Sequence, residues 1–174
     1  MRRALPLGII ADITRCASAR AARAAARGEF LRCTLVEHAT GEKTPMPLVR
    51  IAMREGKPAS YRRAIADGVH AAMVEVANVP PQDRFQILTE HTPEDLIYDA
   101  SYLGIARTDD IVMIQIVLNQ RPTSMKIDLY KSIADRLAGD PGLRREDVLI
   151  SLVPVAPEDW SFGNGKAQYV KENP

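Results

Sequence analysis

The apolar and polar positions of the chain repeat one order twice: a strand, an amphipathic helix and a second strand. In the first block, residues 47–53 predict a strand and residues 84–90 predict another. The helix between them opens at Lys57-Pro58, because proline is tolerated in a first helical turn. The prolines at 80–81 end it. Its predicted apolar stripe consists of Tyr61, Ala64, Ile65, Gly68, Val69, Ala72, Met73 and Val76.

The second block begins with residues 111–118, a nearly unbroken apolar run that is typical of a strand buried on both faces. Thr123 and Ser124 are candidate N-caps of the helix that follows. The glycine-rich stretch 139–142 stops this helix, and residues 147–155 predict the closing strand. The apolar stripe of this helix consists of Leu129, Tyr130, Ile133 and Leu137.

The two blocks match in length, since the first strand of each begins 37 and 36 residues before its second strand. Each block predicts a β-α-β unit with parallel strands. Two fused units form a four-stranded sheet with both helices on one face, which is an α+β fold. The other face of that sheet is bare apolar surface, and we expect partner subunits to cover it.

The segment 160–169 predicts a C-terminal β-hairpin, because Asn164-Gly165 is a strong turn signal. Trp160 is the only tryptophan of the chain. An isolated hairpin is marginally stable in water. We therefore expect this hairpin to pack on another subunit or over a cleft.

The first 45 residues differ from the rest of the chain. Residues 1–45 contain eight Lys or Arg and four Asp or Glu, and residues 16–28 are almost entirely Ala and Arg. An arginine-rich, acid-poor segment is read as a targeting peptide, a secretory signal or a nucleic-acid-binding arm. A start codon placed too far upstream gives the same composition, because it translates GC-rich DNA that precedes the gene.

We favour the upstream start codon. Residues 41–43, Gly-Glu-Lys, are encodable as a purine-rich ribosome-binding sequence, and residues 44–45 give a suitable spacer before the codon of Met46. The expected organisation is then a non-native extension over 1–45 and a single domain over 46–174.

Composition excludes several functional classes. The chain outside the extension holds 15 basic and 18 acidic residues, which gives no electrostatic footprint for nucleic acid. Cys16 and Cys33 have no partners there, so neither a disulfide framework nor a zinc site is expected, which suits the cytoplasm. The apolar run 4–11 is too short to span a membrane. No metal-ligand spacing, phosphate loop or serine nucleophile motif is present, so no metal or cofactor is expected.

Chemistry enters at Met46-Pro47. If Met46 is the first residue translated and is removed, Pro47 gains a free secondary amine that can act as a base or a nucleophile. Inside a longer polypeptide the same nitrogen is an amide, whose lone pair is delocalised into the carbonyl and takes no proton near neutral pH. With residues 1–45 retained, Pro47 simply begins an edge strand.

Four motifs together resemble the tautomerase superfamily, and within it the malonate semialdehyde decarboxylase group. They are Met-Pro-Leu at 46–48, Val-Pro-Pro-Gln-Asp-Arg-Phe-Gln at 79–86, Leu103-Gly104 with Arg107, and Asp-Trp-Ser-Phe-Gly-Asn-Gly at 159–165. The resemblance covers residues 46–170. It implies a tautomerase/MIF-like fold of two β-α-β units, a homotrimer, and an amino-terminal proline as the catalytic group.

The resemblance also implies site residues. Pro47 is the catalytic amine, Asp83 positions a water or aids the proline, and Arg121 binds the carboxylate of the substrate. The surrounding pocket and the charge of Arg121 both lower the pKa of the Pro47 amine towards the working pH. Without the resemblance, Asp83 is read as a turn residue and Arg121 as a solvated arginine. The expected substrate-binding aromatic residues are Trp160, Phe162 and Tyr169, of which Trp160 and Phe162 also suit a trimer interface.

One departure from the decarboxylase pattern separates the possible activities. The pattern carries Arg-Pro-Arg where this chain has Asn119-Gln120-Arg121, so one carboxylate-polarising cation is missing. We therefore expect a cofactor-independent tautomerase acting on a small 2-oxo or 3-oxo carboxylic acid. The alternatives are a malonate semialdehyde decarboxylase/hydratase-like activity with a cationic Pro47, and a catalytically inactive trimeric interaction protein.

Overall fold

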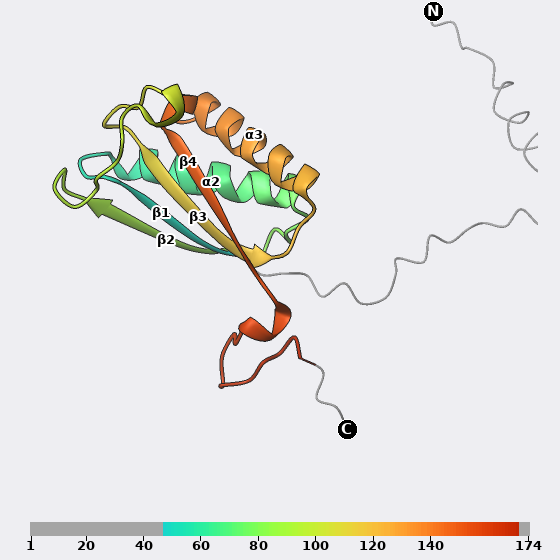
Figure 1. Ribbon diagram of the computed structural model, residues 1–174. Coiled ribbons are helices and arrows are strands. Elements are labelled where there is room, and N and C mark those ends of the chain that lie inside the picture. The colour runs from blue at the N-terminus through green and yellow to red at the C-terminus, as the bar shows by residue number, and fades with distance from the viewer. Residues whose placement is uncertain (1–46, 171–174) are drawn as a thin grey trace, which may run out of the picture. The chain divides into compact units, whose positions relative to one another are not determined.

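A four-stranded mixed sheet organises the chain (Figure 1). Its strands are β1 (Leu48–Arg54), β2 (Phe85–His91), β3 (Val112–Asn119) and β4 (Val148–Val155). Their order is β2-β1-β3-β4, with β1 parallel to β2, β3 parallel to β4, and the two pairs joined by the antiparallel contact of β1 with β3. The structure, a computed structural model, describes residues 47–170.

The two predicted β-α-β units are confirmed, and each strand lies within one residue of its predicted bounds. The predicted extension 1–45 and Met46 lie outside the described residues. Parallel pairing within each unit follows from the helix that connects its two strands. The antiparallel contact joins the units because β1 and β3 are the most buried strands.

Helices α2 (Ala59–Val76) and α3 (Thr123–Gly139) pack side by side on one face of the sheet (Figure 1). Gly68 permits a close crossing, because a Cβ there would meet Cδ2 of the buried Leu137 at 3.0 Å. Alternate strand residues point to this face and form one core with the helices. The fully buried large side chains of the core are Val49, Ile51, Met53, Ile65, Val69, Met73, Ile114, Ile116, Leu129, Ile133 and Leu137.

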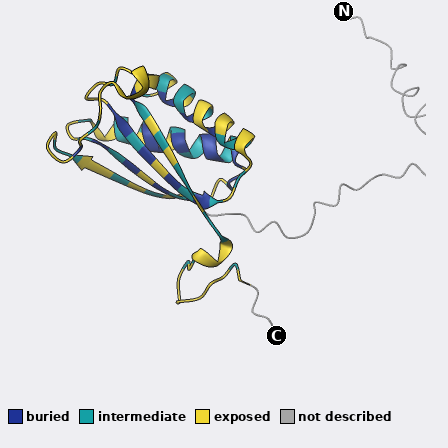
Figure 2. Cartoon of the chain, in the orientation of Figure 1, coloured by how far each residue is buried: buried dark blue, intermediate teal, exposed yellow. Residues whose placement is uncertain are grey.

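The opposite face of the sheet, which we call the open face, is mostly apolar. Figure 2 shows buried and more exposed positions alternating along the strands. Phe85 and Ile87 of the edge strand β2 are 51% and 40% exposed there. Arg50 and Gln115, paired across β1 and β3, are polar exceptions near its centre. Its apolar members are Leu48, Ala52, Phe85, Ile87, Met113, Val117, Leu149, Val153 and Val155.

The predicted C-terminal hairpin is only half right. The turn forms as predicted, with φ of 57° at Asn164 and 65° at Gly165, the pair of left-handed residues that a tight hairpin turn requires. The flanking strands were predicted wrongly, since residues 156–170 contain no strand. The side chain of Gln168 replaces a strand ladder, accepting a hydrogen bond from the Phe162 amide at 3.0 Å and donating to the Gly163 carbonyl at 2.9 Å.

Candidate active site

One end of the sheet collects segments from both halves of the chain. β1 and β2 begin at this end, with Leu48 beside Phe85. β3 and β4 finish there, with Asn119 beside Val155. The antiparallel pairing of β1 with β3 places Leu48 beside Val117, so the start of one unit meets the end of the other. We call this the proline end of the sheet.

The register brings the predicted catalytic residues to the proline end. Pro47 precedes β1 directly and is buried. Asp83 lies two residues before β2, Arg121 two residues after β3, and Trp160 five residues after β4. Each residue therefore follows or precedes a different strand, and the topology of the sheet brings all four segments together.

Asp83 lies in the tight turn that leads into β2. Its amide donates a hydrogen bond to the Pro80 carbonyl at 2.9 Å, and the residue is half-buried. His70 of α2 lies 3.0 Å from the Pro81 carbonyl through Nε2 and fixes the turn to the helix. The next residue, Arg84, pairs with Asp67 of α2 at 2.5 Å. The structure thus gives Asp83 its turn role, and the turn itself lies at the proline end of the sheet.

Arg121 joins the end of β3 to the helix layer. Its guanidinium donates to the Gln120 carbonyl at 3.3 Å and to the Ala77 carbonyl at 3.4 Å. Ala77 caps the C-terminus of α2, where carbonyl groups carry partial negative charge and favour a cation. Arg121 is half-buried and not the freely solvated arginine of the simplest interpretation.

The predicted N-caps of α3 were wrong. The helix begins at Thr123, and Pro122 is the N-cap residue, with no side-chain hydrogen bond to the first turn. The Pro122 carbonyl accepts the first helical hydrogen bond, from the Lys126 amide at 3.1 Å. A proline suits this place because its extended backbone ends the strand connection and lacks an amide hydrogen. The first-turn amides of α3 therefore lie close in sequence to Arg121.

The three predicted aromatic residues form one cluster. Trp160 stacks on Phe162 with ring centres 5.5 Å apart and planes 14° apart. Tyr169 meets Phe162 edge-on at 5.0 Å. The indole nitrogen of Trp160 donates a hydrogen bond to Asn119 Oδ1 at 2.9 Å, which ties the cluster to the end of β3. The segment that carries the cluster extends beyond the proline end of the sheet (Figure 1).

An open hollow of about 610 Å³ lies beside this contact. The ends of β3 and β4 and the residues that follow each strand line it, and they include Asn119, Gln120 and Asp159. Across residues 47–170, no group of three His, Cys, Asp or Glu side chains is placed to hold a metal ion. Among the same residues, no helix is long and apolar enough to cross a membrane.

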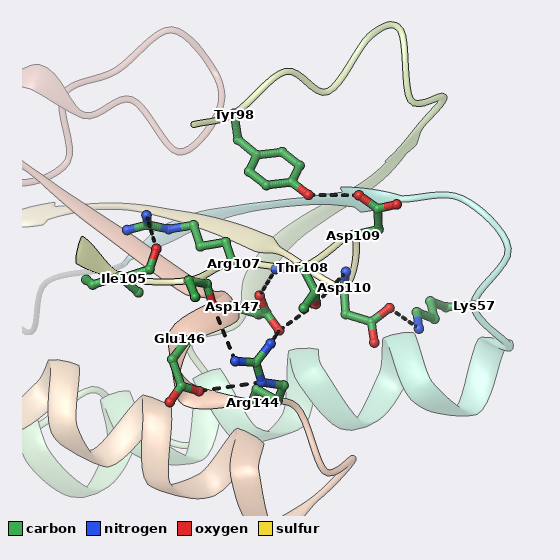
Figure 3. A network of polar contacts seen from close by, with 11 residues as sticks. Lys57, Tyr98, Ile105, Arg107, Thr108, Asp109, Asp110, Arg144, Glu146 and Asp147 are labelled. Atoms are coloured by element: carbon green, nitrogen blue, oxygen red, sulfur yellow. Dashed lines mark hydrogen bonds and ion pairs between the residues drawn. The ribbon is translucent and has the colours of Figure 1, made fainter. Parts of the chain in front are cut away.

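The motif of Leu103-Gly104 with Arg107 lies away from these residues, in the loop from β2 to β3 (Figure 3). The Arg107 guanidinium donates to the carbonyls of Asp99, Tyr102 and Ile105, at 3.4, 3.1 and 3.4 Å. Leu103 adopts a left-handed backbone with φ of 59° inside this wrap. Arg107 therefore fixes the shape of the loop, and nothing in its contacts relates it to Pro47.

A second set of contacts pins the same loop to the opposite end of the sheet. Asp147 is fully buried and accepts hydrogen bonds from the Thr108 amide at 2.6 Å and the Thr108 hydroxyl at 2.8 Å. The Tyr98 hydroxyl donates to Asp109 at 2.8 Å, and this bond raises the pKa of Tyr98. Lys57 forms an ion pair with the Asp110 carboxylate at 2.6 Å, and this contact raises the pKa of Lys57 (Figure 3). Sequence reasoning missed this network, whose one signal was the cluster of acidic residues at 109–110.

Comparison with known proteins identifies the family. Two family models, both described as tautomerase enzyme, match residues 47–104 and 83–163. The probable tautomerase YusQ of Bacillus subtilis (strain 168) is 40% identical over 127 residues, which are 72% of this chain and all of that protein. The chain belongs to the tautomerase family. The probable tautomerase YrdN of the same bacterium is 36% identical over 125 residues, 72% of this chain and 97% of that protein.

Solved structures of tautomerase-family proteins share the fold. Malonate semialdehyde decarboxylase, solved as wild type, with its first proline replaced by alanine, and inactivated, is 30% identical with a TM-score of 0.67. It covers 70% of this chain and 95% of its own. The FG41 malonate semialdehyde decarboxylase inhibited by 3-bromopropiolate is 43% identical with a TM-score of 0.65, covering 70% and 93%. A fused 4-OT symmetric trimer, 18% identical with a TM-score of 0.57, shares the fold over 68% and 94%.

These findings confirm the resemblance to the tautomerase superfamily and its malonate semialdehyde decarboxylase-like group. They also confirm the tautomerase fold and an isomerase-type enzyme. The roles predicted for Pro47, Asp83, Arg121, Trp160 and the rest of the aromatic cluster stay predictions.

Proposed function

We propose that the protein is a cofactor-independent tautomerase of small 2-oxo or 3-oxo carboxylic acids. The observation that carries the proposal is the meeting of Pro47, Asp83 and Arg121 at the proline end of the sheet. The base is the secondary amine that Pro47 gains when Met46 is removed. Membership of the tautomerase family supports this reaction class.

The reaction moves one proton between carbon and oxygen. Arg121 binds the carboxylate of the substrate through its planar guanidinium, which matches the two carboxylate oxygens. The neutral amine of Pro47 takes a proton from the carbon beside the carbonyl, and the electron pair of that C–H bond forms the enolate. The proton returns to the enolate oxygen, and the reverse sequence makes the ketone. Asp83 positions the proline, or a water that lies between the carbon and the oxygen.

Burial of Pro47 supports its role as a base. A buried amine loses hydration in its cationic form, and the charge of Arg121, whose segment reaches the same end of the sheet, acts in the same direction. Both effects favour the neutral amine at neutral pH. A base whose pKa lies near the working pH contributes about 10²–10⁴-fold to the rate of proton transfer.

The amino terminus at Pro47 requires that residues 1–45 be absent from the native protein. Two findings support this requirement: the family match begins at residue 47, and the whole of one relative corresponds to 127 residues of this chain. The intact mass of the protein from its own cell tests it. A mass that includes the arginine- and alanine-rich extension would leave Pro47 as an amide and remove the base.

We further propose a homotrimer in the cytoplasm. The open face supports the trimer, because Phe85 and Ile87 are 51% and 40% exposed on a mostly apolar sheet surface. The related fold of fused 4-OT is described as a trimer. The segment that carries Trp160 extends from the sheet, as expected if it packs on a second copy. Cell fractionation tests the cytoplasmic location, and the mass in solution tests the homotrimer.

The ketonisation of a small enol acid, followed by ultraviolet absorbance, tests the proposed reaction. The protein beginning at Pro47 is expected to show saturable turnover. Arg121→Gln should lower kcat/KM about 10- to 100-fold, since a hydrogen bond to a charged group contributes about 1.5–3 kcal/mol. Arg63→Gln is the matched control, because Arg63 is exposed on α2. Turnover that is insensitive to Arg121→Gln contradicts the assigned role.

The decarboxylase is the second candidate, and the similarity to two malonate semialdehyde decarboxylases favours it. It requires a cationic Pro47 that polarises the carbonyl while CO₂ leaves. Nitrogen NMR of labelled proline separates the two mechanisms: a pKa well below neutral supports the base, and a pKa well above neutral supports the cation. Absence of both turnovers, together with an unchanged trimer, would leave the inactive interaction protein.

A further inference from the structure

The hydrogen bond between Trp160 and Asn119 connects the aromatic cluster with the sheet. Asn119 is the last residue of β3, and Trp160 directly follows the short helix Pro157–Asp159. The indole nitrogen lies 2.9 Å from Asn119 Oδ1, an unstrained hydrogen-bond length. Both side chains are half-buried, so water competes for the bond less than at an exposed site.

The chemistry of the two groups fixes the orientation of the amide. An indole N–H can only donate, so the oxygen of Asn119 faces Trp160 and its NH₂ group faces away. Asn119 and Gln120 line the open hollow of about 610 Å³ at the same place. Asn119 therefore holds the aromatic cluster and also lines the hollow.

An arginine at this position cannot make the same contact. The guanidinium carries five N–H donors and no acceptor, so two donors would face each other across the Trp160 bond. The decarboxylase pattern has an arginine here, and this chain has Asn119. The replacement removes a cation from the site and supplies an acceptor for the indole.

We propose that Asn119 is a positioning residue that fixes the aromatic wall of the site through Trp160. This inference rests on the proposed tautomerase function, in which Arg121 binds the carboxylate two residues further along the chain. Trp160 carries Phe162 with it, because their rings stack at 5.5 Å. Without this bond the aromatic cluster is no longer held at the end of β3, and its rings are not positioned to contact the substrate.

Trp160 gives a direct probe, since it is the only tryptophan in the chain. Asn119→Leu removes the acceptor at similar size, and Asn119→Asp keeps an acceptor. We expect Asn119→Leu to increase quenching of Trp160 fluorescence by acrylamide and to shift the indole N–H resonance, while Asn119→Asp leaves both close to wild type. Glu158→Gln, on an exposed side chain of the short helix before Trp160, is the matched control and should change neither. Circular dichroism verifies that each variant is folded.

Kinetics of enol ketonisation give the second readout. Loss of one hydrogen bond lowers kcat/KM about fivefold, so Asn119→Leu should lower it about 5- to 10-fold, mainly through KM. Glu158→Gln should lower it less than twofold. An unchanged indole signal in Asn119→Leu overturns the proposal. So does a loosened indole with unchanged kcat/KM.

The proposed reaction and the positioning role of Asn119 fail in different ways. If wild-type protein beginning at Pro47 turns over no enol acid, the proposed function fails and the role of Asn119 in it fails too. If that protein is active while the Trp160 signals of Asn119→Leu match wild type, only the positioning role fails.

Discussion

Removal of the Asp147 carboxylate should destabilise the fold strongly without touching the site. Asp147 is fully buried and accepts two hydrogen bonds from Thr108, at 2.6 and 2.8 Å. The Arg144 guanidinium lies 3.7 Å away and supplies the opposite charge. These contacts pin the loop between β2 and β3 to the start of β4 (Figure 3).

The magnitude follows from what Asp147→Ala leaves behind. The Thr108 amide loses its acceptor in a part-buried place, and a hydrogen bond to a charged group contributes about 1.5–3 kcal/mol. The Arg144 guanidinium is half exposed, so the loss of its pairing with Asp147 adds less than about 1 kcal/mol. With both hydrogen bonds to the buried carboxylate lost, we expect Asp147→Ala to lower the free energy of unfolding by about 3 kcal/mol or more. Thr108→Val removes the bond that the hydroxyl donates to Asp147 and the longer one that it accepts from the Asp110 amide, and should cost about 1 kcal/mol.

Urea unfolding followed by far-ultraviolet circular dichroism measures these differences, at one protein concentration because assembly adds to apparent stability. Glu146→Ala is the matched control: its carboxylate lies 3.8 Å from the same Arg144 but is half exposed, so its loss should cost less than about 0.5 kcal/mol. The folded fraction of Asp147→Ala should keep its tautomerase activity. If Asp147→Ala lowers the free energy of unfolding no more than Glu146→Ala does, the stabilising role of the buried carboxylate is refuted.

Three further predictions concern other parts of the molecule. The hydrogen bond to the Asp109 carboxylate raises the pKa of Tyr98 above 10.0, so the stability that this bond contributes is present below pH 10 and is lost as pH rises through the folded pKa. The urea midpoint should therefore fall more steeply from pH 9 to 12 for wild type than for Tyr98→Phe, and parallel curves would argue against the bond. Gly68→Ala should lower the unfolding free energy by about 1 kcal/mol, because the new Cβ crowds the buried Leu137 at 3.0 Å and this overpacking outweighs the higher helix propensity of alanine. A variant more stable than wild type would contradict the close packing of α2 on α3. Ile87→Asp on the open face should reduce the mass measured by light scattering towards the monomer, whereas Ile127→Asp, on the 58% exposed Ile127 of α3, should not; equal masses would contradict the interface.

The sheet and helices were predictable because burial leaves a periodic pattern. The strands read as apolar runs, and α2 and α3 read as stripes at helical spacing. The expectation that β3 is buried on both faces was wrong for the single chain, since Gln115 is exposed on the open face. The predicted bounds of the strands differ from the structure by one residue. The gathering of Pro47, Asp83 and Arg121 also follows from the sequence, since two β-α-β units joined by their first strands place these segments at one end.

Contacts without a sequence period could not be predicted. Asp147 stands at the start of a strand, and only the fold shows that its carboxylate is buried against Thr108. The Asn-Gly turn was readable, but the side chain of Gln168 took the backbone groups that a strand would have paired. The bond from Trp160 to Asn119 joins residues 41 positions apart and has no signature in either segment.

The central claim is that the nitrogen of Pro47 acts as a free amine. Its most direct test compares kcat/KM for ketonisation of one enol acid by two proteins released from an amino-terminal fusion, one beginning at Pro47 and one at Thr44. The account predicts that the protein beginning at Thr44, whose prolyl nitrogen is an amide, loses about 10²–10⁴-fold in kcat/KM. Equal values for the two proteins would contradict the account.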